Sequence, residues 1–116
     1  MYKVNKITEK GGESYEVLRY GLNCVNATVG ENIGSAEEAE KLLEKCQTVE
    51  DIQPPYVWGK HDTLDELIGR LQKVREIVGG DTPVAVQYEN EFGLFHGYTK
   101  GTVNVSVGEN GMLILG

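Results

Sequence analysis

Hydrophobic residues recur with a helical period between residues 64 and 78. The apolar positions are Leu64, Leu67, Ile68, Leu71, Val74, Ile77 and Val78. This spacing of i, i+3, i+4 and i+7 places them along one face of an amphipathic helix. Thr63 and Glu66 have the capping-box spacing that starts a helix, and Gly79, Gly80 and Pro83 end it. The opposite face carries Asp65, Glu66, Arg70, Lys73, Arg75 and Glu76, which we expect to lie in solvent.

An alternating pattern follows this helix and predicts strands up to the end of the chain. Val84, Val86 and Tyr88 alternate with more polar or smaller residues, which is typical of a strand with one buried face. Further short strands are predicted at residues 94–99, 102–107 and 112–115. Asn110-Gly111 favours a type I′ turn before the last strand.

The first part of the chain predicts three strands and one helix. Residues 1–20 have the pattern of a β-hairpin that turns at Gly11-Gly12, and residues 22–29 have that of a third strand. Both sides of this third strand are mixed in polarity, so its pattern does not identify the buried face. Residues 30–34 are predicted as a loop. A second capping box then begins a helix with a narrow apolar stripe; the box is Ser35 and Glu38, and the stripe is Ala36, Ala39, Leu42, Leu43 and Cys46.

The sequence therefore predicts a single α+β domain over residues 1–116. Antiparallel sheets are expected, with two helices packed on one face. The order is β-β-β-α in residues 1–46, a linker at 47–62 that is stiffened by two prolines, and α-β-β-β-β in residues 63–116.

Two short motifs in the second half carry a resemblance to a known group of proteins. T-x-x-E-L-I begins at Thr63, and G-D-x-P-V begins at Gly80 before the short strands. This arrangement resembles the C-terminal segment of many small accessory proteins of phages and prophages. The resemblance implies a small α+β protein from a mobile genetic element, and it supplies no catalytic residue.

The charge of the chain narrows the classes of partner. The net charge is −7. Residues 21–66 contain three Lys and ten Asp or Glu, so this segment alone has a net charge equal to that of the whole chain. An acidic chain of pI 4.8 is poorly suited to nucleic-acid phosphates but suits a basic protein surface. The alternative is that the charge serves solubility. Since no run of 18 apolar residues occurs, we expect a cytoplasmic protein without a membrane span.

The leading functional hypothesis is a non-catalytic anti-defence inhibitor that occupies a basic surface of a host defence protein. The residues expected to bind the partner are Glu37, Glu38, Glu40, Glu44 and Trp58. Acidic side chains favour a basic surface, and an exposed tryptophan is a common interface anchor. The alternatives are that the acidic helix face is ordinary solvated surface and that Trp58 covers the core.

A second hypothesis is an oligomeric protein that sequesters a small nucleotide signal. Its ligand-binding residues would be Lys60, Arg75, Tyr88, Phe92, Phe95 and Tyr98, with Arg70 or Lys100 as further phosphate partners. Aromatic rings beside flexible glycines can stack a base, although alternating rings can equally fill the core of a sheet. A third hypothesis is a structural or assembly factor without a ligand.

Chemistry-bearing residues are few. His61 and His96 lie in no recognised nucleophile or metal setting, and the motifs of common hydrolases and nucleotide-binding loops do not occur. Cys24 and Cys46 lack metal-ligand spacing and are expected to be buried thiols. The sequence therefore predicts a protein that is not an enzyme and holds neither a metal nor a cofactor.

Overall fold

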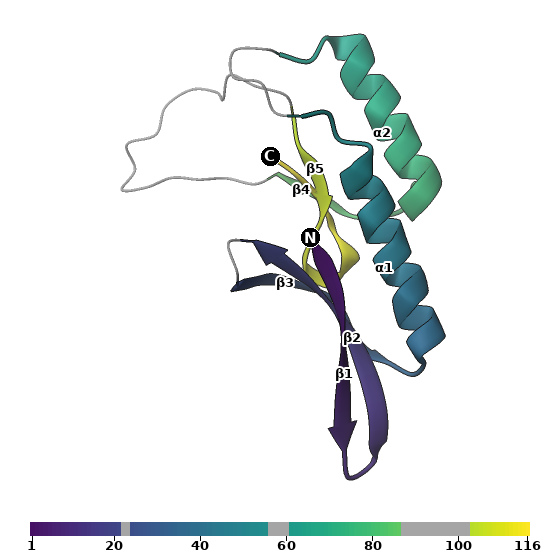
Figure 1. Ribbon diagram of the computed structural model, residues 1–116. Helices are drawn as coiled ribbons and strands as arrows, with labels where there is room; N and C mark the ends of the chain where they lie inside the picture. Colours follow the sequence, from purple (N-terminus) through teal and green to yellow (C-terminus); the bar gives the residue numbers. More distant parts are fainter. Residues whose placement is uncertain (22–23, 56–60, 87–102) are drawn as a thin grey trace.

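The chain folds as one small α+β domain (Figure 1). The computed structural model describes residues 1–21, 24–55, 61–86 and 103–116. Within these ranges there are two long helices and two sheets of three strands each. The predicted fold class is confirmed. The predicted strand at 94–99 lies outside the described residues.

The N-terminal sheet is an antiparallel meander. Its strands are β1 (Tyr2–Glu9), β2 (Gly12–Gly21) and β3 (Cys24–Ile33), in the order β1-β2-β3. The predicted loop at 30–34 is wrong for its first residues, because β3 continues to Ile33, where it pairs with Tyr15 of the ten-residue β2. The long partner strand offers pairing sites that the local sequence does not reveal.

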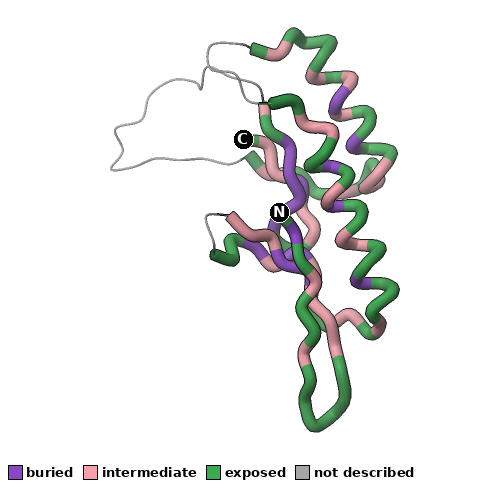
Figure 2. Tube along the Cα trace, viewed as in Figure 1, coloured by how far each residue is buried: buried purple, intermediate pink, exposed green. Residues whose placement is uncertain are grey.

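The inner face of the N-terminal sheet is now identified. Ala27 and Val29 of β3 are buried, whereas Val25 is 48% exposed. On β2 the adjacent Val17 and Leu18 are both buried, because register shifts between β2 and β3 interrupt the alternation there. Figure 2 shows the contrast between this buried inner part and the exposed far end of the β1–β2 hairpin.

Helix α1 spans Ala36–Asp51 and helix α2 spans Leu64–Val78. The Oγ of Ser35 accepts from the backbone N of Glu38 at 3.2 Å, and Thr63 and Glu66 form the complete capping box. Both predicted helix starts are confirmed. Helix α1 runs into the segment that was predicted as linker, because Val49, which is fully buried, extends the apolar stripe by one more turn. The two helices lie side by side on one side of the strands (Figure 1).

The C-terminal sheet has the order β4-β6-β5, with β4 at Val84–Val86, β5 at Val105–Val107 and β6 at Leu113–Leu115. Strands β5 and β6 are antiparallel, but β4 and β6 are parallel, so the expectation of purely antiparallel sheets is wrong. The cause is the strand order: β6, the second arm of the β5–β6 hairpin, inserts between β4 and β5.

The predicted turn between β5 and β6 is confirmed. It lies within the short 3₁₀ turn η1 (Glu109–Gly111), where Asn110 has φ 55° and ψ 27° and Gly111 has φ 76°. Positive φ at both central residues defines a type I′ turn, and the Met112 N–H donates to the Glu109 carbonyl at 3.0 Å.

Side chains from three other segments close the free edge of the strand that contains β5. The backbone N–H groups of Val103, Val105 and Val107 donate outward, away from β6. Their acceptors are Asp62 Oδ2 at 2.7 Å, Gln53 Oε1 at 3.1 Å and the Tyr2 hydroxyl at 2.9 Å. The Tyr2 hydroxyl also donates to the Val107 carbonyl at 2.8 Å, which joins the two sheets.

Candidate functional site

The predicted acidic residues occupy the outward face of α1. Glu37, Glu38, Glu40 and Glu44 are all exposed, while Ala39, Cys46 and Val49 on the opposite face are buried. The Ser35 cap fixes where the helix starts, and the helical period then directs these carboxylates outward. Glu37 pairs with Lys41 at 3.5 Å, whereas Glu38, Glu40 and Glu44 form no ion pair with a described residue.

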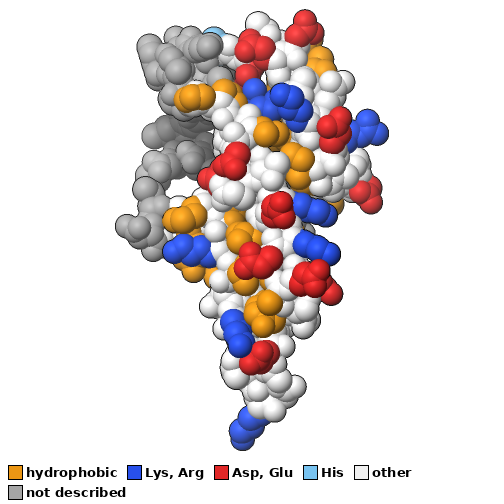
Figure 3. Space-filling model, turned by 45° about the vertical axis from the view of Figure 1, so that its right-hand side comes forward, with side chains coloured by type: hydrophobic (Ala, Val, Ile, Leu, Met, Phe, Trp, Pro, Cys, Tyr) orange, Lys and Arg blue, Asp and Glu red, His pale blue; other side chains and the backbone are white. Residues whose placement is uncertain are grey.

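A shallow groove runs beside this acidic face. It has a volume of about 380 Å³, and it is lined by Tyr2, Glu40, Leu43, Glu44 and Gln47. The groove therefore combines two carboxylates with an apolar floor. Lysine and arginine side chains have an apolar stem and a charged head, so this lining is complementary to them. Figure 3 shows acidic side chains interspersed with basic and hydrophobic ones over the helical side of the molecule.

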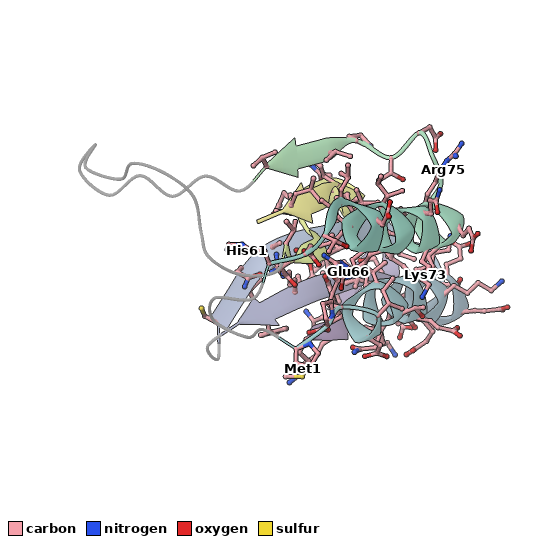
Figure 4. The ribbon with its side chains drawn as sticks, turned by 90° about the horizontal axis from the view of Figure 1, so that it is seen from above. Met1, His61, Glu66, Lys73 and Arg75 are labelled. Atoms are coloured by element: carbon pink, nitrogen blue, oxygen red, sulfur yellow. The ribbon has the colours of Figure 1, made fainter. Side chains whose placement is uncertain are left out.

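Most residues of the nucleotide hypothesis, and one of the inhibitor hypothesis, lie outside the described residues. These are Trp58, Lys60, Tyr88, Phe92, Phe95, Tyr98 and Lys100. Arg75 is exposed in the last turn of α2, in an open hollow with Gln72, Glu76 and Gly80. Figure 4 shows Arg75 at one end of α2 and His61 near the other. Arg75 is therefore distant from the start of α2, which follows Lys60 in the sequence.

Arg70 is not on the solvent face of α2, contrary to the prediction. Its side chain is 8% exposed, and its NH1 and NH2 groups donate to the two carboxylate oxygens of Asp62 at 3.0 and 2.8 Å. The NH2 group also donates to the Val103 carbonyl at 2.9 Å, while Nε has no hydrogen-bond partner. These hydrogen bonds hold the pKa of the Asp62 carboxyl below its usual range. Arg70 is thus engaged within the protein and is not available to a phosphate.

The two cysteines have different environments, so the expectation of two buried thiols is wrong for one of them. Cys24 is exposed at the start of β3, and its Sγ donates to the Gly21 carbonyl at 3.2 Å. Cys46 is fully buried on the inner face of α1, and burial raises the pKa of its thiol to about 11. In the described part of the chain, His, Cys, Asp and Glu side chains form no cluster that could hold a metal ion.

A further hollow lies between the two sheets, and it was not predicted from the sequence. It has a volume of about 260 Å³ and is lined by residues of β1, β2, β3, α1 and the strand around β5, among them Arg19, Asn26, Asn104 and Ser106. The one sequence signal that pointed to this hollow is the alternation along β2, which places Arg19 on the same face of the strand as Val17. We name this hollow the inter-sheet cleft.

Comparisons with known proteins find no match among protein-family models, curated proteins or solved structures. The likeness to phage and prophage accessory proteins therefore rests on the two short motifs alone. No helix in the described ranges has the length and apolar character needed to span a membrane.

Proposed function

We propose that this protein is a non-catalytic binding protein that docks on a basic surface of a partner protein through the outward face of α1. The observation that carries the proposal is the groove beside α1, where Glu40 and Glu44 flank the apolar side chains of Tyr2 and Leu43. Such a groove suits the side chain of a partner lysine or arginine, since both its stem and its charge meet a complementary surface.

The charge of α1 supports the same assignment. The helix carries six acidic and two lysine side chains, and three of the glutamates that we expect to bind have no ion-pair partner among the described residues. Complementary charge of this kind speeds association and selects the partner. The resemblance to phage and prophage accessory proteins makes a host defence protein the class of partner to test first.

A charge-reversal experiment tests the proposal. Proteins captured from bacterial lysate by the wild-type chain are purified, and their affinities are measured for wild type and for the variant Glu40→Lys/Glu44→Lys. Because close charge pairs across interfaces are worth about 1.5 kcal/mol or more each, the double reversal should weaken binding about 100-fold or more.

The matched control is Glu9→Lys/Glu31→Lys. It makes the same change in net charge at two exposed positions of the N-terminal sheet that do not line the groove, and should bind like the wild type. A complex that tolerates the reversal at Glu40 and Glu44, or that is weakened equally by the control, would refute docking through α1.

A further inference from the structure

The inter-sheet cleft contains an arginine, Arg19, that has no ion-pair partner among the described residues. In the register of the N-terminal sheet, Arg19 stands directly between Tyr2 of β1 and Ala27 of β3. Side chains of directly paired residues project from the same face of a sheet. Because Tyr2 and Ala27 are 5% and 8% exposed, Arg19 projects from the buried face of the sheet and is itself only partly exposed.

The charge of Arg19 is not neutralised within the described structure. The other Lys and Arg side chains there are exposed, and of Arg19 and Arg70 only Arg70 has an ion pair. The carboxylates that line the hollows around Arg19 are engaged elsewhere. Glu50 pairs with the Met1 amine at 3.1 Å, and Glu109 accepts from the Thr28 N–H at 3.1 Å. A partly buried guanidinium without a counter-ion has a desolvation cost that a bound anion would offset.

Polar side chains around Arg19 can complete an anion site. Asn26, Asn104 and Ser106 line the same cleft, and the side chains of all three form no hydrogen bond with a described residue. Each can donate at least one hydrogen bond, and the guanidinium fork is suited to binding a carboxylate with two parallel bonds. The volume of about 260 Å³ is below the usual range for larger ligands, so a small molecule or a single end group fits.

We infer that the inter-sheet cleft binds a small carboxylate, with Arg19 as its charge partner and Asn26, Asn104 and Ser106 as hydrogen-bond donors. The site shares only Tyr2 with the groove beside α1 and does not depend on the docking function. A singly charged group is favoured over a phosphate dianion, because Met1 and Glu50 in the cleft lining pair with each other and leave Arg19 as the one unpaired charge among the described lining residues.

Acetate is the probe, and amide NMR spectra at constant ionic strength are the readout. Saturable shifts of the side-chain amides of Asn26 and Asn104 are expected. Arg19→Gln should weaken acetate binding about tenfold or more, since it removes a charge-assisted pair of hydrogen bonds. Lys10→Gln, which makes the same charge change on the exposed hairpin turn, should leave the affinity unchanged.

A second variant keeps the test decisive if Arg19→Gln does not fold. Asn104→Asp places a carboxylate in the cleft and should compete for Arg19, so acetate binding is lost although Arg19 is present. Shifts that grow linearly with acetate, or equal titrations of Arg19→Gln and Lys10→Gln, would overturn the site. Inorganic phosphate that saturates at lower concentration than acetate would overturn the assignment to a carboxylate.

Discussion

Removing one charge from the Asp62–Arg70 pair should strongly destabilise the fold. Both side chains are almost fully shielded from solvent, at 6% and 8% exposure, and the pair joins the start of α2 to the Val103 backbone before β5. Asp62→Asn preserves the shape of the side chain and leaves an oxygen that can accept from the Val103 N–H. It removes the negative charge, so the guanidinium of Arg70 remains buried without a counter-ion.

The expected magnitude follows from this loss of a counter-ion. Removing one partner of a buried ion pair costs about 3–5 kcal/mol, and we use the lower end, about 3 kcal/mol, because Asp62 lies just before α2 and the pair is outside the hydrophobic core cluster. For a domain of this size, each kcal/mol lowers Tm by about 4–5 °C, which gives a fall of about 12–15 °C.

Thermal and urea unfolding monitored by circular dichroism measure this loss. The control is Asp81→Asn, which makes the same chemical change at an exposed carboxylate that has no ion pair in the described structure. Adding Arg70→Met to Asp62→Asn should recover at least half of the stability, because the unpaired charge is then gone. Equal midpoints for Asp62→Asn and the control, or additive losses in the double variant, would refute the reasoning.

The same pair predicts a pH dependence. Hydrogen bonds from Arg70 lower the pKa of folded Asp62, so the folded protein keeps this carboxylate ionised to lower pH than the unfolded chain does. Its contribution to stability is complete above the ordinary aspartate pKa of about 3.9 and is lost as the pH falls below that value through the folded pKa. Unfolding of the Asp62→Asn variant should lack this part of the acid dependence.

Two further predictions concern the Tyr2 hydroxyl and the cysteines. Tyr2→Phe leaves the N–H and carbonyl of buried Val107 without their partner, so it should lower the free energy of unfolding in urea by about 2–3 kcal/mol. The control is Tyr15→Phe, whose hydroxyl has no hydrogen bond to a described residue and whose loss should change stability little. Equal losses in the two variants would contradict this. At pH 8 a thiol reagent should label exposed Cys24 but not buried Cys46, which labels only after unfolding; two rapidly reacting thiols in the folded protein would contradict this.

Helix starts and the final turn could be predicted because their signals are local. Ser35 and Thr63 each bond to a backbone group three residues away, and the type I′ turn depends on two adjacent residues that tolerate positive φ. The acidic face of α1 was predicted for the same reason, since the cap and the helical period suffice to direct Glu40 and Glu44 outward. The ends of β3 and α1 depend on pairing and packing with distant segments, and they were predicted too early.

The burial of charged side chains could not be predicted, because it depends on partners that are distant in sequence. Arg70 bonds to the Val103 carbonyl across 33 positions, and no pattern around Arg70 indicates that contact. Arg70 lies next to Leu71 and three residues after Leu67, at the boundary of the apolar stripe. At that boundary, helical periodicity does not determine whether a side chain is buried. Arg19 is similar: alternation gave its face on β2, but only the position of the second sheet makes that face the wall of a cleft.

The closed edge of β5 bears on the proposed mode of binding. An open strand edge presents a row of backbone donors and acceptors to which another chain can add a strand. Here Tyr2, Gln53 and Asp62 already occupy the outward donors beside and within β5, and Tyr2 reaches Val107 across 105 positions of sequence. A partner strand at this edge would have to displace buried contacts from three segments. Docking on α1 displaces none of them, since the carboxylates there are exposed before any partner arrives. The contacts that join the two sheets therefore also close this edge of the C-terminal sheet to a partner strand.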